Sequence, residues 1–439
     1  MNIKQLNKFI NRFVSEKLPR LEKLDRYYLG KHEILNKPNR TKDVVDTKAV
    51  NNYARLISTL ASAYFLGKPL AYKVVDVDRE QEFKNLAEYL TSEEEQQENF
   101  EHALNCSIYG KSYELWNVGL DGKIDGIVID PKTMFLIKDN TIFKNTLYAV
   151  RFQIQDNGDN EEEYTCEVYD DRTVTVYNYI AKDRQILEST IQSQTMLHGF
   201  DRVPVVEFVN NSKEQGDFEP VLTLIDAYNE AVSTSIDDLK DFSDAYLMLK
   251  NMRGTDSEDI KSLKENKVLL VDENGDAKWL IKDVNDSYSQ NIKNRLNQDI
   301  HKFSLIPDMT DKEFAGNSSG VALGFKLLGL EQLGGQKEMY FKKAINKRLE
   351  LVIAYNNFNI TPQDVQKIFT RNTPKNLVEI ANVVSTLVGT VSQETLLSIL
   401  PFIEDAKQEL DKIKKEEQEY TDDMNTPLKD NKDGQILAR

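Results

Sequence analysis

The feature that most constrains the fold is a regular amphipathic pattern between residues 219 and 250. Apolar residues recur there at steps of three and four, which is the spacing of one face of an α-helix. At about 1.5 Å per residue, such a helix would be roughly 45 Å long. That length exceeds a small globular core, so we expect the helix to project from one or to span it. The apolar positions are Val221, Ile225, Tyr228, Val232, Ile236, Leu239, Phe242, Tyr246 and Leu249.

The opposite face of this segment is acidic, with Glu230, Asp237, Asp238, Asp241 and Asp244. In a chain with 72 acidic residues, such a face is more often solvated helix surface than a carboxylate pair for acid–base catalysis.

A short insert, 251–285, separates this helix from a second one. Residues 267–271 and 278–281 read as two strands joined through a turn at 272–275 that contains Asn274-Gly275, so we expect a hairpin at the tip of the helix pair. The second helix is expected at 287–305, because Pro307 prevents its continuation.

The remaining chain predicts an α+β fold that is mainly helical. Residues 1–70 read as helices that stop at Gly67-Lys68-Pro69, and β-branched and aromatic residues alternate with polar ones over 112–209, which indicates an antiparallel sheet. A polar loop at 308–319 precedes a long helical pattern from 320 to 358. We expect that helix to bend at Gly334-Gly335, since each glycine costs about 1 kcal/mol in a helix interior. A helical pair follows at 377–388 and 393–403, then a Lys/Glu-rich helix and a polar tail.

Composition argues against several classes of protein. A net charge of −16 is the opposite of the basic surface that general DNA binding requires. Cys106 and Cys166 are too few for a disulfide framework, so we expect two free, buried thiols in a reducing compartment. Neither a signal peptide nor an apolar run long enough to span a bilayer is recognisable, which predicts a soluble protein made in the cytoplasm.

Motifs for chemistry are largely missing from the sequence. Gly110-Lys111-Ser112 lacks the upstream glycine of a phosphate loop, because Asn105 occupies that position. The four histidines have no Cys, His or carboxylate at local ligand spacing, and no G-x-S-x-G elbow occurs. We therefore expect no cofactor, no metal site and no enzymatic activity.

Several short motifs, in this order of elements, resemble those of the portal proteins of siphovirus-type bacteriophages. Residues 24–32, LDRYYLGKH, are similar to the family's opening Y-Y-x-G signature, and 51–69, from Asn51-Asn52-Tyr53 to Tyr64-Phe65-Leu66-Gly67-Lys68-Pro69, are similar to its N-x-x-x-x-I…Y-x-x-G-K-P segment. Residues 109–114, 129–132, 319–331 and 342–351 also resemble family segments. The C-terminal part carries no motif of the family.

The resemblance implies a portal fold with wing, stem, clip and crown, assembled as a ring of twelve subunits. The implied parts are a wing at 1–218, stem helices at 219–250 and 286–306, a clip at 251–285, a tunnel loop at 308–320, a long kinked wing helix at 321–360, crown helices at 361–420 and a flexible tail at 421–439.

The implied function is the channel for DNA packaging and ejection at one capsid vertex of the virion. The implied partners are the terminase motor, the major capsid and scaffolding proteins, head-completion or adaptor proteins, and double-stranded DNA, with no membrane involved. Synthesis would take place in the cytoplasm of the bacterial host.

Residues for these contacts follow from the same resemblance. Because an acidic bore repels phosphates and lets a duplex slide, we expect the stem acids Asp237, Asp238, Asp241 and Asp244 to line the channel. The alternative is that this face points outward to solvent. In the tunnel loop, Lys312, Phe314 and Asn317 are expected to touch DNA, unless the loop is a plain linker. The clip residues expected to dock partners are Lys267, Asp272, Glu273, Asn274, Lys278 and Trp279.

Two alternatives from other classes remain at this stage. One is a metal-dependent DNA-processing enzyme of a mobile element, with Asp130, Asp170 and Asp171 as metal-binding carboxylates. The other is a helical adaptor with paired coiled coils, although the apolar spacing drifts from strict heptads.

Overall fold

The structure of the chain is a computed structural model that describes residues 1–39, 46–158, 161–182, 185–243, 246–250, 276–280, 286–310, 320–373, 377–400, 402–403 and 406–425. These residues belong to two compact units. The first comprises 1–310 and 327–372, and the second comprises 311–326 and 373–439.

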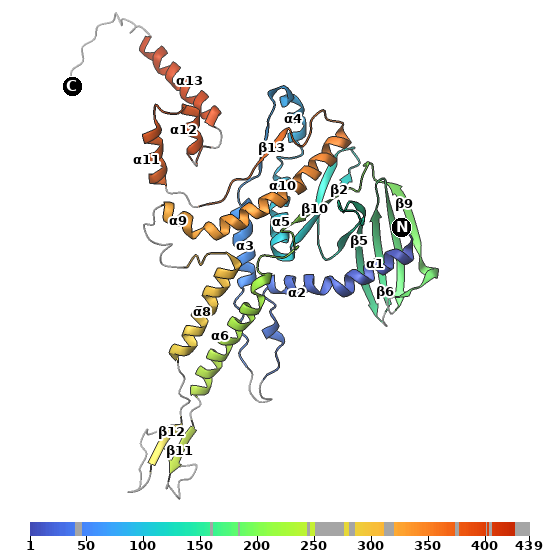
Figure 1. Ribbon diagram of the computed structural model, residues 1–439, viewed down its shortest axis with the longest axis vertical. Coiled ribbons are helices and arrows are strands. Elements are labelled where there is room, and N and C mark those ends of the chain that lie inside the picture. Colours follow the sequence, from blue (N-terminus) through green and yellow to red (C-terminus); the bar gives the residue numbers. More distant parts are fainter. Residues whose placement is uncertain are drawn as a thin grey trace, which may run out of the picture. The chain divides into compact units, whose positions relative to one another are not determined.

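The first unit contains eight of the described α-helices (Figure 1). They are α1 (Ile3–Glu16), α2 (Leu18–Tyr28), α3 (Tyr53–Leu66), α4 (Glu80–Ala87), α5 (Glu93–Tyr109), α6 (Leu222–Ser243), α8 (Asp286–Ser304) and α10 (Leu328–Asn356). Short 3-10 helices lie at η1 (Glu33–Asn36), η2 (Val77–Arg79), η3 (Glu188–Thr190) and η4 (Glu219–Val221).

The strands of this unit form four antiparallel sheets. Their bounds are β1 (Ala71–Val74), β2 (Lys111–Val118), β3 (Ile124–Ile129), β4 (Met134–Lys138), β5 (Thr146–Gly158), β6 (Glu161–Tyr169), β7 (Thr173–Lys182), β8 (Gln185–Ile186), β9 (Gln192–Leu197), β10 (Val205–Val209), β11 (Tyr246–Lys250), β12 (Asp276–Leu280) and β13 (Val365–Ile368). The orders are β10-β2-β3, β4-β5-β6-β7-β8 with β9 also paired to β7, β1-β13 and β11-β12.

The main core lies between the three-stranded sheet and a layer made of α3, α5 and α10. Phe65 of α3, Cys106 of α5 and Phe341 of α10 meet Trp116 and Phe208 of the sheet there. The other face of β2 packs through Tyr113 and Leu115 on residues of the larger sheet and its neighbours. Since β2 is buried on both faces, its sequence lacks the alternation of a half-exposed strand.

Local signals explain where the helices of this layer begin and end. The Asn52 side chain accepts from the Arg55 amide at the start of α3, and the Ser92 side chain accepts from the Glu95 amide at the start of α5. Gly110, with a left-handed backbone, ends α5. The predicted helix stop at Gly67 is confirmed as the C-cap of α3.

The predicted first long helix is shorter than its apolar spacing suggested. The α-helix ends at Ser243, and Tyr246–Lys250 is instead strand β11. Strand β12 pairs with β11, and the strand expected as its hairpin partner, 267–271, lies outside the described residues. A short apolar run such as 246–249 fits either a helix or a strand, so its pairing partner decides.

The long C-terminal helix is also interrupted at a different place from the one predicted. It runs through Gly334 and Gly335 without a break, and the interruption separates α9 (Gly320–Lys326) from α10 at Leu327. A Cβ at Gly334 would lie 3.2 Å from Arg371 Nε and 3.5 Å from Tyr64 Cε1. The glycine therefore permits close packing on α3, which outweighs its low helix propensity.

The second unit contains α9 and three further helices. These are α11 (Leu377–Leu387), α12 (Gln393–Ile399) and α13 (Ala406–Asn425). The predicted Ser392 cap is confirmed, since its side chain accepts from the Thr395 amide. Residues 361–372, which we expected in the crown, belong to the first unit because β13 pairs with β1. Residues 421–425, expected in a flexible tail, are helical.

Candidate functional site

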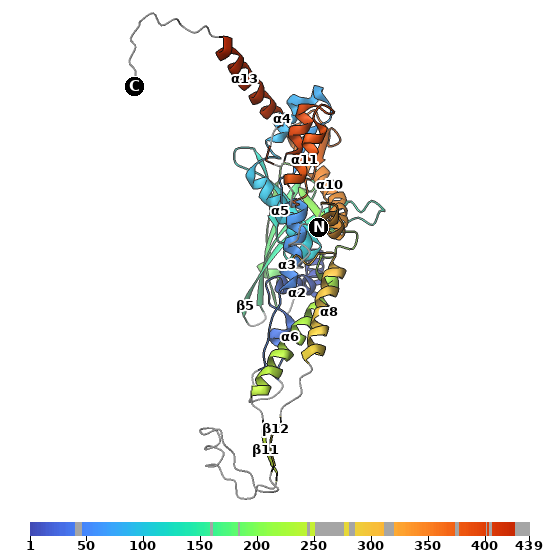
Figure 2. The ribbon, with the colours of Figure 1, turned by 90° about the vertical axis from the view of Figure 1, so that its left-hand side faces the viewer.

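The helices α6 and α8 lie side by side and form a pair at one end of the first unit (Figures 1 and 2). On α6, a row of buried residues recurs at every fourth position. The row begins apolar, with Val221 at the end of η4 and Ile225 on α6, and becomes polar along α6 with Asn229, Ser233 and Asp237. The polar half needs hydrogen-bonding partners, because a buried polar group without one is costly.

An extended segment, residues 46–51, supplies those partners. Alternate backbone amides of the segment each donate to one side chain of the α6 row. The hydrogen bonds are Thr47 N to Asp237 Oδ1 (2.9 Å), Ala49 N to Ser233 Oγ (2.9 Å) and Asn51 N to Asn229 Oδ1 (2.7 Å). We call these six residues the polar ladder.

The polar ladder is possible because two chain geometries have nearly the same repeat. Four residues of an α-helix rise about 6 Å. Two residues of an extended strand rise about 6.6 Å. Every second amide of 46–51 therefore meets every fourth side chain of α6. The segment and α6 run in opposite directions.

Asp237 departs from the expectation of a channel-facing carboxylate. It is 6% exposed, since the extended segment covers it. Burial alone would raise its pKa, but hydrogen bonds from Thr47 and Lys240 lower the pKa of Asp237 below its ordinary value. The carboxylate is therefore held ionised as an acceptor within the subunit.

His32 fixes the other end of the polar ladder. Its Nε2 lies 3.0 Å from the Tyr27 carbonyl and its Nδ1 lies 2.9 Å from the Asn229 side-chain amide. The carbonyl requires a proton on Nε2, so Nδ1 accepts from Asn229. Burial lowers the pKa of His32, which favours this neutral form. Tyr27 in turn donates to Asp226 of α6 at 2.7 Å.

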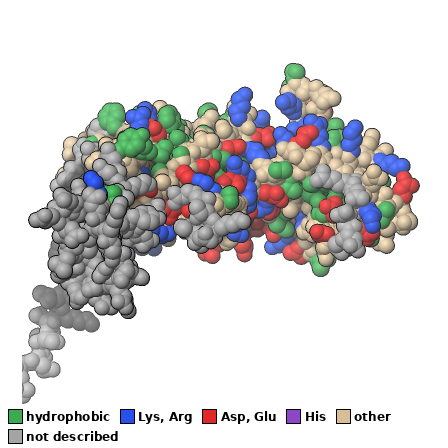
Figure 3. Space-filling model, turned by 90° about the horizontal axis from the view of Figure 1, so that it is seen from below, with side chains coloured by type: hydrophobic (Ala, Val, Ile, Leu, Met, Phe, Trp, Pro, Cys, Tyr) green, Lys and Arg blue, Asp and Glu red, His purple; other side chains and the backbone are tan. Residues whose placement is uncertain are grey.

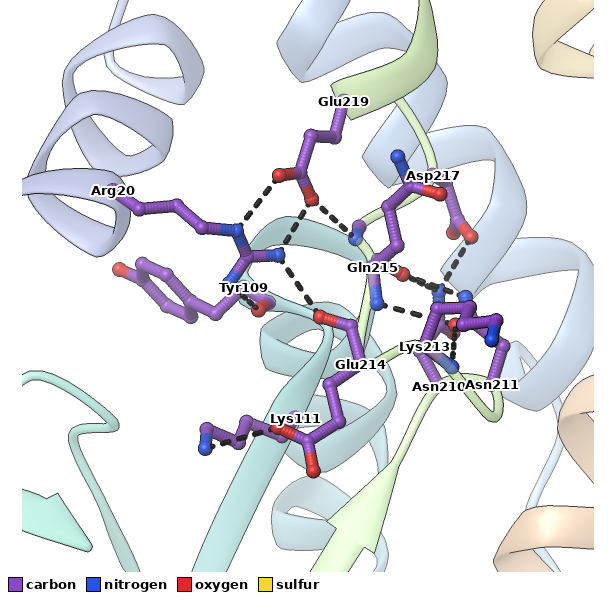
Figure 4. A network of polar contacts seen from close by, with 11 residues as sticks. Arg20, Tyr109, Lys111, Asn210, Asn211, Lys213, Glu214, Gln215, Asp217 and Glu219 are labelled. Atoms are coloured by element: carbon purple, nitrogen blue, oxygen red, sulfur yellow. Dashed lines mark hydrogen bonds and ion pairs between the residues drawn. The ribbon is translucent and has the colours of Figure 1, made fainter. Parts of the chain in front are cut away.

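The start of the helix pair is fixed by residues 210–219, which we call the anchor loop (Figure 4). Arg20 of α2 binds the Glu219 carboxylate with both Nε and Nη2, at 2.7 and 2.6 Å. The same guanidinium donates to the Glu214 carbonyl at 2.9 Å. A two-pronged arginine–carboxylate contact fixes orientation as well as distance. The direction in which α6 leaves the sheet is thereby set.

A buried ion pair closes the anchor loop from the opposite side. Lys337 of α10 lies 2.6 Å from Asp217 and 2.5 Å from the Asn210 side-chain oxygen. Asn210 also donates to Asp217 at 2.8 Å. Helix α10, the end of strand β10 and the start of α6 are therefore joined by one polar cluster.

Several large apolar side chains of the helix pair face outward. Leu239 is 68% exposed, Tyr288 is 65% exposed and Ile292 is 36% exposed. These side chains are available for contact with another molecule. On the face of the molecule seen in Figure 3, acidic and basic side chains are interspersed.

Comparison with known proteins decides the family. Residues 7–423 match the family described as phage portal protein, SPP1 Gp6-like. This chain belongs to that portal family.

Individual members of the family match over most of their length. The portal protein of Bacillus phage SPP1 is 25% identical over 440 residues, covering 92% of this chain and 85% of that protein. The portal protein of Clostridium phage phiCD119 is 25% identical over 412 residues, covering 87% and 89%.

A solved structure shares the fold at lower identity. A chain from the neck of an empty GTA particle matches with a TM-score of 0.50 and 11% identity, over 81% of this chain and 91% of that chain. The portal resemblance read from the sequence motifs is thus confirmed.

The expected channel-facing acids of this portal chain are only partly described. Asp238 is half-buried on α6. Asp241 lies on α6, but the structure does not describe its side chain, and Asp244 lies outside the described residues. The tunnel-loop residues Lys312, Phe314 and Asn317 also lie outside them.

The expected clip residues are described only at β12. Lys278 pairs with Met248 and Trp279 pairs with Leu247 in the antiparallel register of β11 and β12. The other four, Lys267, Asp272, Glu273 and Asn274, lie outside the described residues.

The carboxylates that were candidates for a metal site accept hydrogen bonds from backbone amides within turns instead. Asp130 accepts from the Lys132 amide, and Asp170 accepts from the amides of Arg172 and Thr173. Within the described residues, no group of three His, Cys, Asp or Glu could hold a metal ion. No described helix is long and apolar enough to cross a membrane. Cys106 and Cys166 are free and buried, as predicted.

Sequence reasoning missed the residues that anchor the helix pair. Arg20, Asn210 and Lys337 are more than one hundred residues apart in the chain, so no local pattern marks them. The one available signal is a lysine on the buried side of a helix, since Lys337 lies one turn before Phe341 of the core.

Proposed function

We propose that this chain forms a ring of twelve subunits around a channel at the capsid vertex of a tailed phage. Double-stranded DNA would pass through the channel during packaging and ejection. Membership of the portal family over residues 7–423 is the observation that carries the proposal. The portal name of the two phage relatives supports it further.

The helix pair α6 and α8 serves as the stem in this proposal. Its exposed Leu239, Tyr288 and Ile292 would be covered by neighbouring copies in the ring. Burying such residues contributes about 25 cal/mol per Å² of apolar surface removed from water. The polar ladder and the anchor loop hold the stem rigidly, so that a channel wall built from many copies keeps its shape.

The other parts follow from the position of the stem in the chain. Residues 1–218 and α10 form the wing, and 251–285, which contains β12, forms the clip together with the adjoining strand β11. The part of the second unit from 373 onward forms the crown. The clip docks the terminase motor and later the head-completion proteins, through residues such as Lys278 and Trp279. The wing contacts the major capsid and scaffolding proteins.

The channel wall is acidic in this proposal. Asp238, Asp241 and Asp244 face the DNA from the stem, and Lys312, Phe314 and Asn317 face it from the tunnel loop. Negative charge repels the phosphates and prevents the duplex from adhering. Asp237 is left out of the lining, because it holds residues 46–51 within the subunit.

The ring is tested by native mass spectrometry and negative-stain imaging of the purified full-length chain. We expect closed rings with a central hole, of twelve copies when assembled with capsid and scaffolding proteins. A particle that stays a single subunit in both settings contradicts the proposal.

The acidic lining is tested by DNA packaging into capsids carrying the Asp238→Lys variant. We expect a lower packaged length than in wild type, because the lysines bind phosphates during transit. Lys31→Glu, an exposed change outside the stem, is the control. Equal packaging by Asp238→Lys and wild type would exclude Asp238 from the lining.

A further inference from the structure

A buried ion cluster under the three-stranded sheet contains more acid than base. Arg348 of α10 is completely buried and lies 2.5 Å from Glu95 and 2.6 Å from Glu114. One guanidinium thus faces two carboxylates. The nearby His102 adds no positive charge, because burial lowers its pKa and favours the neutral ring.

The cluster opens into a depression of about 310 Å³ between α5 and β3. Six carboxylates line it, from Glu88, Glu94, Glu95, Glu98, Glu114 and Asp125. Lys123 lies at the same depression and is exposed. Glu95 is 7% exposed, and its Oε2 has no hydrogen-bond partner among the described residues, although Oε1 binds Arg348. A buried acceptor therefore remains open in the lining.

The depression suits a further cation, because its six carboxylates outnumber the two cations that the subunit supplies there, Arg348 and Lys123. Burial, together with the carboxylates of Glu114 and Asp125, raises the pKa of Glu98 to about 8. An incoming positive charge would relieve this repulsion. A metal ion does not fit, because no group of three ligands in the described part of the chain has suitable geometry. The cation that fits the depression is therefore an ammonium or guanidinium group on a side chain.

The opposite edge of the same sheet carries such groups. The sheet order is β10-β2-β3, so the depression lies at the β3 edge and α10 packs over the β10 edge. Lys343 and Lys347 are exposed one helical turn apart on α10, and no carboxylate of the described residues forms an ion pair with either. Partial burial and the nearby ammonium groups of Lys343 and Lys138 lower the pKa of Lys347, although the carboxylates of Glu207 and Glu350 act in the opposite direction. Lys347 therefore remains available to a carboxylate of another molecule.

The depression and the lysines of the opposite edge are linked through α10. Lys347 is adjacent in the chain to Arg348, which reaches the buried cluster behind the depression. In a closed ring, rotation about the axis brings one side of a subunit onto the other side of the next, without a shift along the axis. Figure 2 shows α5 and α10 on opposite sides of the first unit.

We propose that the depression between α5 and β3 receives Lys347 of the partner subunit, so that opposite sheet edges meet head to tail around the ring. The proposal rests on the ring of the proposed function. It adds a specific polar contact between the wings of neighbouring subunits. In this contact, the ammonium group of Lys347 offsets the excess negative charge of the acidic cluster.

Two charge reversals test this contact in the full-length chain. Glu98→Lys places a positive charge in the depression, and Lys347→Glu removes the incoming one. Each variant alone brings like charges together, so we expect the assembled fraction to fall about tenfold or more at equal protein concentration. Native mass spectrometry measures the fraction. Circular dichroism and thermal unfolding of each variant, together with Asp125→Lys as a second, exposed reversal, separate loss of contact from loss of fold.

A one-to-one mixture of the two variants gives the deciding result. In an alternating ring each altered depression meets an altered Lys347 position of the opposite charge. We expect assembly to recover, with equal numbers of both variants and an even number of copies. Glu101→Lys, an exposed change on the same helix outside the depression, should assemble as wild type does.

The outcomes distinguish this inference from the function on which it rests. Wild-type assembly by each reversal alone, or folded variants whose mixture does not recover, overturns the wing contact and leaves the ring intact. Absence of rings from the wild-type chain overturns the ring itself.

Discussion

The ammonium group of Lys337 lies 2.6 Å from the Asp217 carboxylate, and both side chains are almost completely buried. This pair joins α10 to the loop from which α6 starts, so the two helices share one electrostatic contact. Removing one partner from such a pair leaves an uncompensated charge in the interior, which typically costs about 3–5 kcal/mol.

We expect Lys337→Met to lower the free energy of unfolding by that amount, about 3–5 kcal/mol. Urea unfolding followed by tryptophan fluorescence measures it, since Trp116 is 4% exposed in the adjoining core. Lys342→Met, which removes a partly exposed pair with Glu338, is the matched control and should cost about 1 kcal/mol or less. Equal losses in both variants would show that the Lys337 contact is no stronger than a surface pair.

The polar ladder predicts a local effect of Ser233→Ala. The change removes the acceptor of the Ala49 amide, and an unsatisfied buried donor costs about 1–3 kcal/mol. We expect hydrogen exchange at the Ala49 amide to accelerate about tenfold, with smaller increases at Thr47 and Asn51. Thr234→Ala, an exposed neighbour on α6, should leave these three amides unchanged. Unaltered exchange in the Ser233 variant argues against the ladder.

The sequence predicted most helices of the first unit, because their signals are local. The apolar spacing on 219–243, the Ser392 cap and the stop at Gly67 each depend on residues within a few positions. The alternation that marks 112–209 as antiparallel sheet is equally local. The family motifs then placed these elements in the portal order.

What the sequence did not reveal depends on partners that are distant in the chain. Asp237 reads as one more acid on a charged face, and only the extended segment across it makes it a buried acceptor. Gly334 reads as a helix breaker, but Tyr64 and Arg371 pack where its side chain would be. Tyr246–Lys250 continues a helical spacing, yet pairs with β12. Tertiary contact outweighed local preference in each case.

We expect the substitution Gly110→Ala, which adds a single methyl group, to lower the stability of the chain strongly. Its φ is +85°, and a Cβ there would lie 1.9 Å from the Glu214 carbonyl oxygen of the anchor loop. Gly110→Ala therefore combines left-handed strain of about 1–2 kcal/mol with a backbone clash. We expect a loss of about 3 kcal/mol or more in the free energy of unfolding, or failure to fold.

Gly122→Ala is the matched control for that change. Gly122 has a φ of +79° but nothing within 4 Å of the added Cβ, so the strain acts alone. We expect a loss of about 1–2 kcal/mol, measured by the same urea unfolding. If both variants lose the same free energy of unfolding, the close approach of the anchor loop to Gly110 adds nothing to the cost of the substitution.

Glu98 predicts how subunit stability changes with pH. Burial and the neighbouring carboxylates of Glu114 and Asp125 raise its pKa from 4.5 to about 8. Between these values the folded chain retains a proton that the unfolded chain releases. The protonated group thus contributes stability that is complete below about pH 4.5 and is lost as the pH rises through about 8.

Glu98→Gln removes the titrating group and keeps the shape of the neutral side chain. The variant should match wild type near pH 5 and become more stable than wild type as the pH approaches 8. The urea midpoint of the variant minus that of wild type therefore grows with pH. Glu101→Gln, an exposed change one turn along α5, should show a constant difference over the same range. If the Glu98→Gln difference stays constant as well, the carboxylates around the depression do not repel one another as the structure indicates. The electrostatic reason for a cation to bind in the depression would then be removed.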